Sequence, residues 1–167
     1  MHGKSVPLIR QMGTTDCGIA CLTMLFQYYG FNIDISEMKA RIKIGRNGVS
    51  LAKMRDIAEE YGFSFKAYSD YLEEQNLLSN LPVIMCSKEN HFVVVSERKH
   101  GKYVVLDPVK GKLKMNYADI QNAFLNILVL IRPSGNISYN KIKSDFQVPV
   151  NKTKFVIAIL LTFIAQS

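Results

Sequence analysis

Apolar residues in the first 62 positions recur at helical spacing. Those between positions 19 and 29 lie three and four residues apart, which predicts a helix from Asp16 to the residue before Gly30. A shorter helix is predicted after Ser36, and a third is predicted from Ser50, a natural N-cap, to Gly62, a natural stop. The N-terminal part of the chain is therefore expected to be helical.

The pattern changes to alternation and β-branched runs after position 62. Strands are predicted at 63–67, 82–86, 91–97, 103–107, 112–115 and 127–131, with short helices near 71–78 and 117–124. The basic stretch 98–102 is predicted to be a hairpin loop. Helices followed by neighbouring strands predict an α+β fold, with a helical N-terminal half packed on an antiparallel sheet.

The composition and charge of the chain exclude some classes of protein and some partners. Hydrophobic residues make up 48% of the 167 residues, and three cysteines are too few for a disulfide scaffold. The formal net charge of +7 suits an anionic membrane face or an acidic peptide, and two basic stretches, 39–43 and 110–114, could face either one. For most individual lysines the expected role is a solvated basic surface. Nucleic acid is not predicted as a partner, because no stacking motif accompanies the charge.

The end of the chain is apolar. Residues 155–165 read FVIAILLTFIA and follow a polar linker, whereas a membrane-spanning helix needs about 20 apolar residues. The run is either a packed terminal helix or the first half of a transmembrane helix that continues beyond this chain. Its all-round apolar pattern favours the second interpretation. At the other end, no apolar core of a secretory signal is present.

Cys17 is a candidate nucleophile. It lies at the predicted start of a helix, where the helix dipole and unpaired N–H groups favour the thiolate. The alternative is that Cys17 is a small buried hydrophobic residue, as most free cysteines are. Cys86 is predicted to be in the core, His100 to be solvated, and a zinc site from Cys17 and Cys21 is not supported by ligand spacing.

A nucleophilic cysteine needs a base and an orienting group. His91 opens one predicted strand and Asp107 closes the next, so a symmetric hairpin centred on residue 99 would place them directly opposite each other. This inference depends on the register of the two strands. Gln11, a few residues before Cys17, could donate to an oxyanion together with the backbone N–H of Cys17.

Four blocks of this sequence together resemble the double-glycine leader peptidases, which are papain-like cysteine peptidase domains of peptide-exporting ABC transporters. The blocks, in chain order, are Gln11, Asp16–Leu22, Asn90–Val94 and Val105–Pro108. The resemblance implies Cys17 as nucleophile, His91 as general base and acid, Asp107 as orienting group, and Gln11 in the oxyanion hole.

The resemblance also implies the biological setting. The substrate would be a bacteriocin or lanthipeptide precursor with an amphipathic helical leader ending in Gly-Gly, cut at the cytoplasmic face of the bacterial membrane. The transporter would be a homodimer, and the domain itself would need no cofactor, because ATP is used elsewhere in the transporter. A non-catalytic domain that docks peptide cargo is the alternative function.

Two further expectations follow. The domain boundaries are expected at 1–135 for the peptidase, 136–154 for the linker and 155–167 for the start of the truncated membrane helix. Three apolar residues of the helical half, Met38, Ile42 and Met54, are guessed to be exposed and to contact the leader.

Overall fold

The structure is a computed structural model that describes residues 5–42, 48–70 and 72–135. The helices of this part are α1 (Cys17–Tyr28), α2 (Ile35–Arg41), α3 (Leu51–Glu60), α4 (Glu74–Asn80) and α5 (Tyr117–Ala123). The strands are β1 (Phe63–Ser69), β2 (Val83–Cys86), β3 (Phe92–Lys99), β4 (Lys102–Asp107), β5 (Gly111–Met115) and β6 (Ile127–Pro133). Three helices come first, and the strands, which form one antiparallel sheet, follow with α4 and α5 between them, so the α+β prediction is confirmed.

The strands form one sheet in the order β1-β6-β2-β3-β4-β5, and the pairs along it are antiparallel. The last strand, β6, lies between β1 and β2 and joins the first strand to the rest of the sheet. Alternate residues of β3 point to opposite faces of the sheet, and each face packs in its own core cluster. Phe92 and Val94 pack with the helical half, whereas Val93 and Val95 pack with the residues near α4 and α5.

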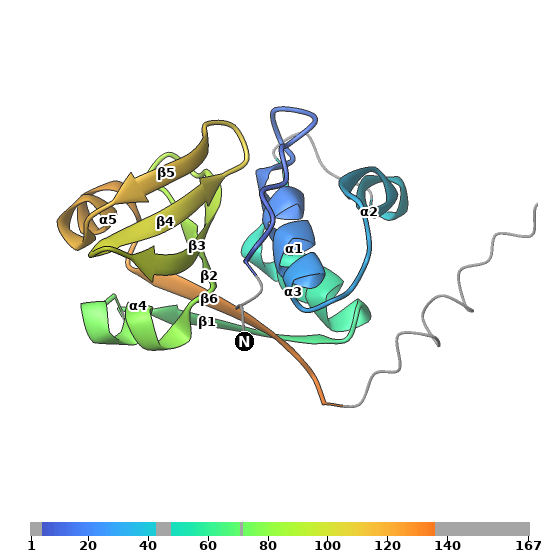
Figure 1. The fold of residues 1–167 in the computed structure, drawn as a ribbon. Coiled ribbons are helices and arrows are strands. Elements are labelled where there is room, and N and C mark those ends of the chain that lie inside the picture. The colour runs from blue at the N-terminus through green and yellow to red at the C-terminus, as the bar shows by residue number, and fades with distance from the viewer. Residues whose placement is uncertain (1–4, 43–47, 71, 136–167) are drawn as a thin grey trace, which may run out of the picture. The chain divides into compact units, whose positions relative to one another are not determined.

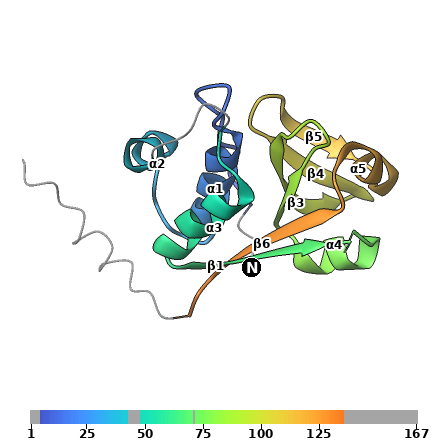
Figure 2. The ribbon, with the colours of Figure 1, turned by 180° about the vertical axis from the view of Figure 1, so that it is seen from behind.

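Helices α1, α2 and α3 gather on one side, and α4 and α5 lie on the other side, beyond the strands (Figure 1). The view from behind shows the same separation (Figure 2). Helix α1 is buried from Gly18 to Phe26, because it packs against β3 as well as against α2 and α3. This central position explains why almost all of α1 is apolar, rather than one stripe only.

Local signals set most helix starts. The Ser50 hydroxyl accepts the Lys53 N–H at 3.2 Å, as its N-cap position predicts. The Asn116 side chain accepts the Asp119 N–H, and the Asp119 carboxylate accepts the Asn116 N–H in return, which together form a capping box. Such bonds form within one turn of chain, so the sequence alone is enough to predict them.

The hairpin between β3 and β4 differs from its prediction. The expected five-residue loop is wrong, because β3 extends to Lys99 and β4 begins at Lys102. The turn consists of His100 and Gly101 alone, and both have positive φ angles, of 50° and 76°. Such a turn matches the right-handed twist of the strands that it joins. The side chain of His100 is exposed, as predicted.

The terminal apolar run 155–165 and the linker 136–154 lie outside the described residues, so the predicted domain boundaries stay predictions. Among the residues that the structure describes, no helix is both long enough and apolar enough to cross a membrane.

Candidate active site

His91 and Asp107 form a hydrogen-bonded pair at the ends of two neighbouring strands. His91 immediately precedes β3, Asp107 is the last residue of β4, and the imidazole Nε2 lies 2.8 Å from the carboxylate Oδ1. The Asp107 side chain is only 5% exposed, whereas that of His91 is 25% exposed. The carboxylate is therefore shielded from water behind an imidazole that remains accessible.

The loop after β4 holds the Asp107 carboxylate in its ionised form. Its Oδ1 also accepts the Val109 N–H at 2.7 Å and the Lys110 N–H at 3.0 Å. Burial by itself raises the pKa of Asp107, but the bonds from Lys110, His91 and Val109 outweigh that effect and leave the pKa below its ordinary value. The site therefore offers a fixed negative charge to the imidazole.

The register that brings the pair together is not the predicted one. Val94 pairs with Leu106 and Val95 with Val105, so the continued ladder places Asp107 opposite Val93, two residues beyond His91. The prediction of direct opposition is wrong because the turn lies at His100 and Gly101, later than the predicted centre at residue 99, so that Lys99 pairs with Lys102. The bulge between Val95 and Glu97 then shifts the pairing back by one residue. A shift of two residues keeps both side chains on one face, and diagonal neighbours in a sheet can still touch.

Cys17 is the first residue of α1 and is partly exposed. Its neighbour Gly18 sits in a tight gap, where an added Cβ would lie 2.4 Å from Val49 and 3.5 Å from the ring of Phe92. Phe92 directly follows His91, so this contact brings the N-terminus of α1 beside the start of β3. Glycine is therefore required by the close approach of Val49, and the ordinary contact with Phe92 places the chain segments of Cys17 and His91 side by side.

The other two thiols have surroundings that suppress ionisation. Cys21 is fully buried, and this burial, followed by the nearby Cys17, raises its pKa well above the ordinary value. Burial also raises the pKa of Cys86, which is 8% exposed in the core, as predicted for that residue. Because the thiolate is the reactive form, a raised pKa makes each of these two thiols a weak nucleophile.

Gln11 lies in the loop before α1 and is hydrogen-bonded to the residue that follows β4. Its backbone N–H donates to the Pro108 carbonyl at 3.2 Å, next to Asp107. Its side-chain Nε2 donates to the Gly13 carbonyl at 2.8 Å, while Oε1 is buried without a hydrogen-bond partner among the described residues. An amide nitrogen carries two N–H groups, so the bond to Gly13 orients the amide and leaves a second donor.

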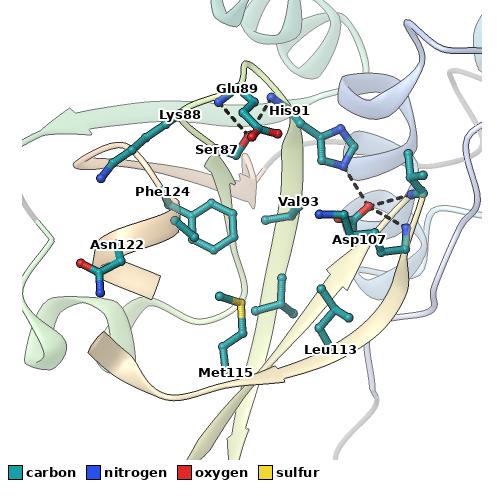
Figure 3. Close-up of a pocket in the computed structure, with 14 residues that line it drawn as sticks. Ser87, Lys88, Glu89, His91, Val93, Asp107, Leu113, Met115, Asn122 and Phe124 are labelled. Atoms are coloured by element: carbon teal, nitrogen blue, oxygen red, sulfur yellow. Dashed lines mark hydrogen bonds and ion pairs between the residues drawn. The ribbon is translucent and has the colours of Figure 1, made fainter. Parts of the chain in front are cut away.

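A cavity of about 460 Å³ opens beside the His91–Asp107 pair (Figure 3). Its lining combines the two site residues with apolar side chains of β3, β4, β5, the loop after β4 and the end of α5. The apolar members are Val93, Val105, Val109, Leu113, Met115, Ala123 and Phe124. Charged side chains, those of Lys88, Glu89 and Lys110, also line it. Such an apolar pocket with a few polar groups is typical of a binding site.

The three residues guessed to contact a leader do not lie at this cavity. Met38 and Met54 are fully buried and Ile42 is 9% exposed, so the expectation that they are exposed is wrong. All three pack in the core between the helices and the sheet. Sequence reasoning instead missed the lining on β5, although the alternation of Leu113 and Met115 with lysines was a usable signal.

Residues 5–136, which include all of these groups, match the peptidase C39 family. The chain belongs to this family. The colicin V secretion/processing ATP-binding protein of Escherichia coli is 29% identical to this C39 chain over 161 residues, 96% of the chain. The lacticin-481/lactococcin-DR transport/processing ATP-binding protein of Lactococcus lactis is 28% identical over 149 residues, 87% of the chain. The C39 chain spans only 22% of the length of each of these relatives.

Solved structures share the fold of this C39 domain. A double glycine motif protease from an AMS/PCAT transporter, solved in complex with its leader peptide, aligns with a TM-score of 0.69 at 27% identity. That alignment covers 80% of this chain and 96% of the protease. The peptidase domain of Streptococcus ComA aligns with a TM-score of 0.66 at 21% identity, over 77% of this chain and 98% of that domain. The papain-like fold and the resemblance to double-glycine leader peptidases are therefore confirmed.

Proposed function

We propose that this C39 domain is a cysteine endopeptidase that removes the leader from an exported precursor peptide, with Cys17 as its nucleophile. The observation that carries the proposal is the His91–Asp107 hydrogen bond at the mouth of the apolar cavity, in a chain of the C39 family. A base held by a carboxylate, near the N-terminus of the helix that begins with Cys17, is the arrangement that thiol catalysis needs.

The hydrogen bond of His91 to Asp107 decides the path of the proton. Because Nε2 donates to Asp107, Nδ1 is the ring nitrogen that accepts the proton from the Cys17 sulfur. The sulfur attacks the scissile carbonyl carbon, and His91 then gives the proton to the leaving amine as the peptide bond breaks. Water attacks the resulting thioester with the same imidazole as base, which releases the leader and restores the thiol.

Gln11 and the start of α1 supply the oxyanion site. The Asp16 side chain makes no cap bond to α1, so its carboxylate does not occupy the first N–H groups of the helix. The second N–H of the Gln11 amide and the backbone N–H of Cys17 donate to the oxygen of the tetrahedral intermediate. Such donors act on charge that develops only in the transition state, so they raise kcat more than they lower KM.

The apolar cavity is the proposed docking place for the leader. An amphipathic helix can place its apolar residues, spaced at i, i+3, i+4 and i+7, into such a pocket. A Gly-Gly pair at the end of the leader would let the chain enter a narrow slot toward Cys17, since it carries no side chains that would clash. A relative of this fold was solved in complex with a leader peptide, which supports leader binding by such a domain.

The chain acts, on this proposal, as the peptidase domain of a peptide-exporting ABC transporter at the cytoplasmic face of the bacterial membrane. The similarity to secretion and processing proteins for colicin V and lacticin 481 supports that setting. ATP is used by parts of the transporter outside this chain, the transporter is a homodimer, and the domain uses no cofactor of its own.

The test is cleavage of a precursor peptide with a Gly-Gly leader, followed by mass spectrometry. The wild-type chain should cut after the second glycine, and Cys17→Ala should not. Leu113→Gln, in the cavity, should raise KM by roughly tenfold, from about 1–2 kcal/mol of lost apolar contact. Lys102→Gln, an exposed position on the neighbouring strand β4 and outside both basic stretches, is the control and should leave KM unchanged. Binding without cleavage by the wild type would identify a cargo-docking domain instead.

A further inference from the structure

Asp16, the residue before Cys17, holds a buried carboxylate that the proposed chemistry does not use. Its side chain is 3% exposed and forms an ion pair with Lys39 of α2, whose Nζ lies 2.5 Å from Oδ2. The same Oδ2 accepts the backbone N–H of Gly13 at 2.6 Å. A buried charge is tolerated only when it is paired and hydrogen-bonded, and Asp16 meets both conditions.

The carboxylate does not serve the helix that it precedes. Asp16 occupies the N-cap position of α1, where an aspartate usually accepts an N–H of the first turn, yet it makes no such bond. It turns back instead to the loop before the helix. Gly13 permits this close approach, because an added Cβ there would lie 3.2 Å from Oδ2.

A continuous chain of contacts runs from Lys39 to the amide of Gln11. Lys39 holds the Asp16 carboxylate, the carboxylate holds the Gly13 N–H, and the Gly13 carbonyl accepts the Gln11 Nε2–H at 2.8 Å. The loop is fixed at its other end by the bond from Gln11 N–H to the Pro108 carbonyl. The orientation of the Gln11 amide therefore depends on a charge on another helix.

We infer that the Asp16–Lys39 ion pair is a positioning element for the oxyanion loop, residues 11–16, and that Lys39 acts on catalysis through Gln11. This inference rests on the proposed peptidase function. Without the lysine, the carboxylate would be left as an uncompensated buried charge and would turn toward water, which releases Gly13 and with it the Gln11 amide. Small misplacements of a catalytic group are known to cost up to about 10²-fold in rate.

The test compares Lys39→Met with wild type in precursor cleavage. We expect kcat to fall by roughly 10- to 10²-fold with KM changed less than about threefold, because the oxyanion donor acts on the transition state. Lys39→Arg should restore most of kcat, since it returns a cation. Glu37→Gln is the matched control, because it removes an exposed ion pair from the same helix, and it should behave as wild type.

Two more measurements separate positioning from general destabilisation. Gln11→Ala combined with Lys39→Met should be no slower than Gln11→Ala alone, since both changes remove the same donor. Hydrogen–deuterium exchange of the segment 11–16 should rise in Lys39→Met while exchange in β3 stays unchanged. If Lys39→Met does not fold, Asp16→Asn takes its place, and a smaller loss in kcat is expected because its amide oxygen still accepts from Gly13.

Unchanged kcat in a folded Lys39→Met variant, or losses that multiply in the double variant, would overturn the inference. Failure of the proposed function is seen separately, as a wild-type chain that leaves the precursor intact. The positioning role is then decided by exchange in the loop 11–16 alone: a rise in Lys39→Met supports it, and no change refutes it.

Discussion

Replacing Asp107 with asparagine tests the role of charge in the proposed site with little change in geometry. The Oδ1 atom of Asp107 accepts from His91 Nε2, from the Val109 N–H and from the Lys110 N–H. Two of these donors belong to the backbone and cannot adapt, so the amide of an asparagine must turn its oxygen toward them. The oxygen then also keeps the bond to His91, and with it the tautomer that leaves Nδ1 free.

The expected loss in kcat arises because the amide oxygen of asparagine is neutral and lacks the charge of the carboxylate. A hydrogen bond to a charged group contributes about 1.5–3 kcal/mol, and a neutral one about 0.5–1.5 kcal/mol. Adding part of the attraction between carboxylate and imidazolium gives a loss of about 1.5–3 kcal/mol, which is roughly 10- to 10²-fold in kcat. His91→Ala removes the base itself and should cost roughly 10³-fold or more.

The assay is the initial rate of precursor cleavage at saturating substrate for wild type, Asp107→Asn and His91→Ala. Thermal unfolding of the same samples shows that each variant is folded. Asp107→Ala is a poorer test, because it leaves the Val109 and Lys110 N–H groups without their acceptor and destabilises the loop. If Asp107→Asn is as inactive as His91→Ala, the imidazole needs the carboxylate charge, and an orienting role that a neutral amide can fill is wrong.

Three other predictions concern individual groups. Iodoacetamide near neutral pH should label Cys17 and leave Cys21 unlabelled in peptide mapping, since burial raises the pKa of Cys21; labelling of Cys21 first would move the nucleophile there. Gln11→Ala should lower kcat by on the order of 10²–10³ with little change in KM, and a raised KM at normal kcat would place Gln11 in substrate binding instead. The pKa of Asp107 is lowered on folding, so its carboxylate should stabilise the fold above the ordinary carboxyl pKa and lose this contribution as pH falls through the folded pKa. The difference in Tm between wild type and Asp107→Asn should therefore shrink from about pH 6 to about pH 3. A constant difference would contradict the lowered pKa.

Local signals predicted most elements of this protein. Periodicity and a serine cap placed α3, a glycine stop ended it, and alternating residues placed β1 directly afterwards. The candidate residues Cys17 and His91 were identified because their chemistry is visible in the residue type and its place at the end of an element. Gln11 was identified from its place a few residues before Cys17 and from the family resemblance. These features depend on a few neighbouring residues, so they can be read without knowing the fold.

Tertiary structure alone decided how distant parts meet. The bulge near Glu97 changed which residues of β3 and β4 face each other, and no local pattern marks it. The pairing of Asp16 with Lys39 joins the residue before α1 to a residue of α2, and no local spacing in the sequence predicts it. The apolar periodicity of Met38 and Met54 showed that they lie on an apolar face, but whether that face meets core or peptide depends on what packs against it. A sequence pattern records which side chains avoid water, and only the packed chain decides what covers them.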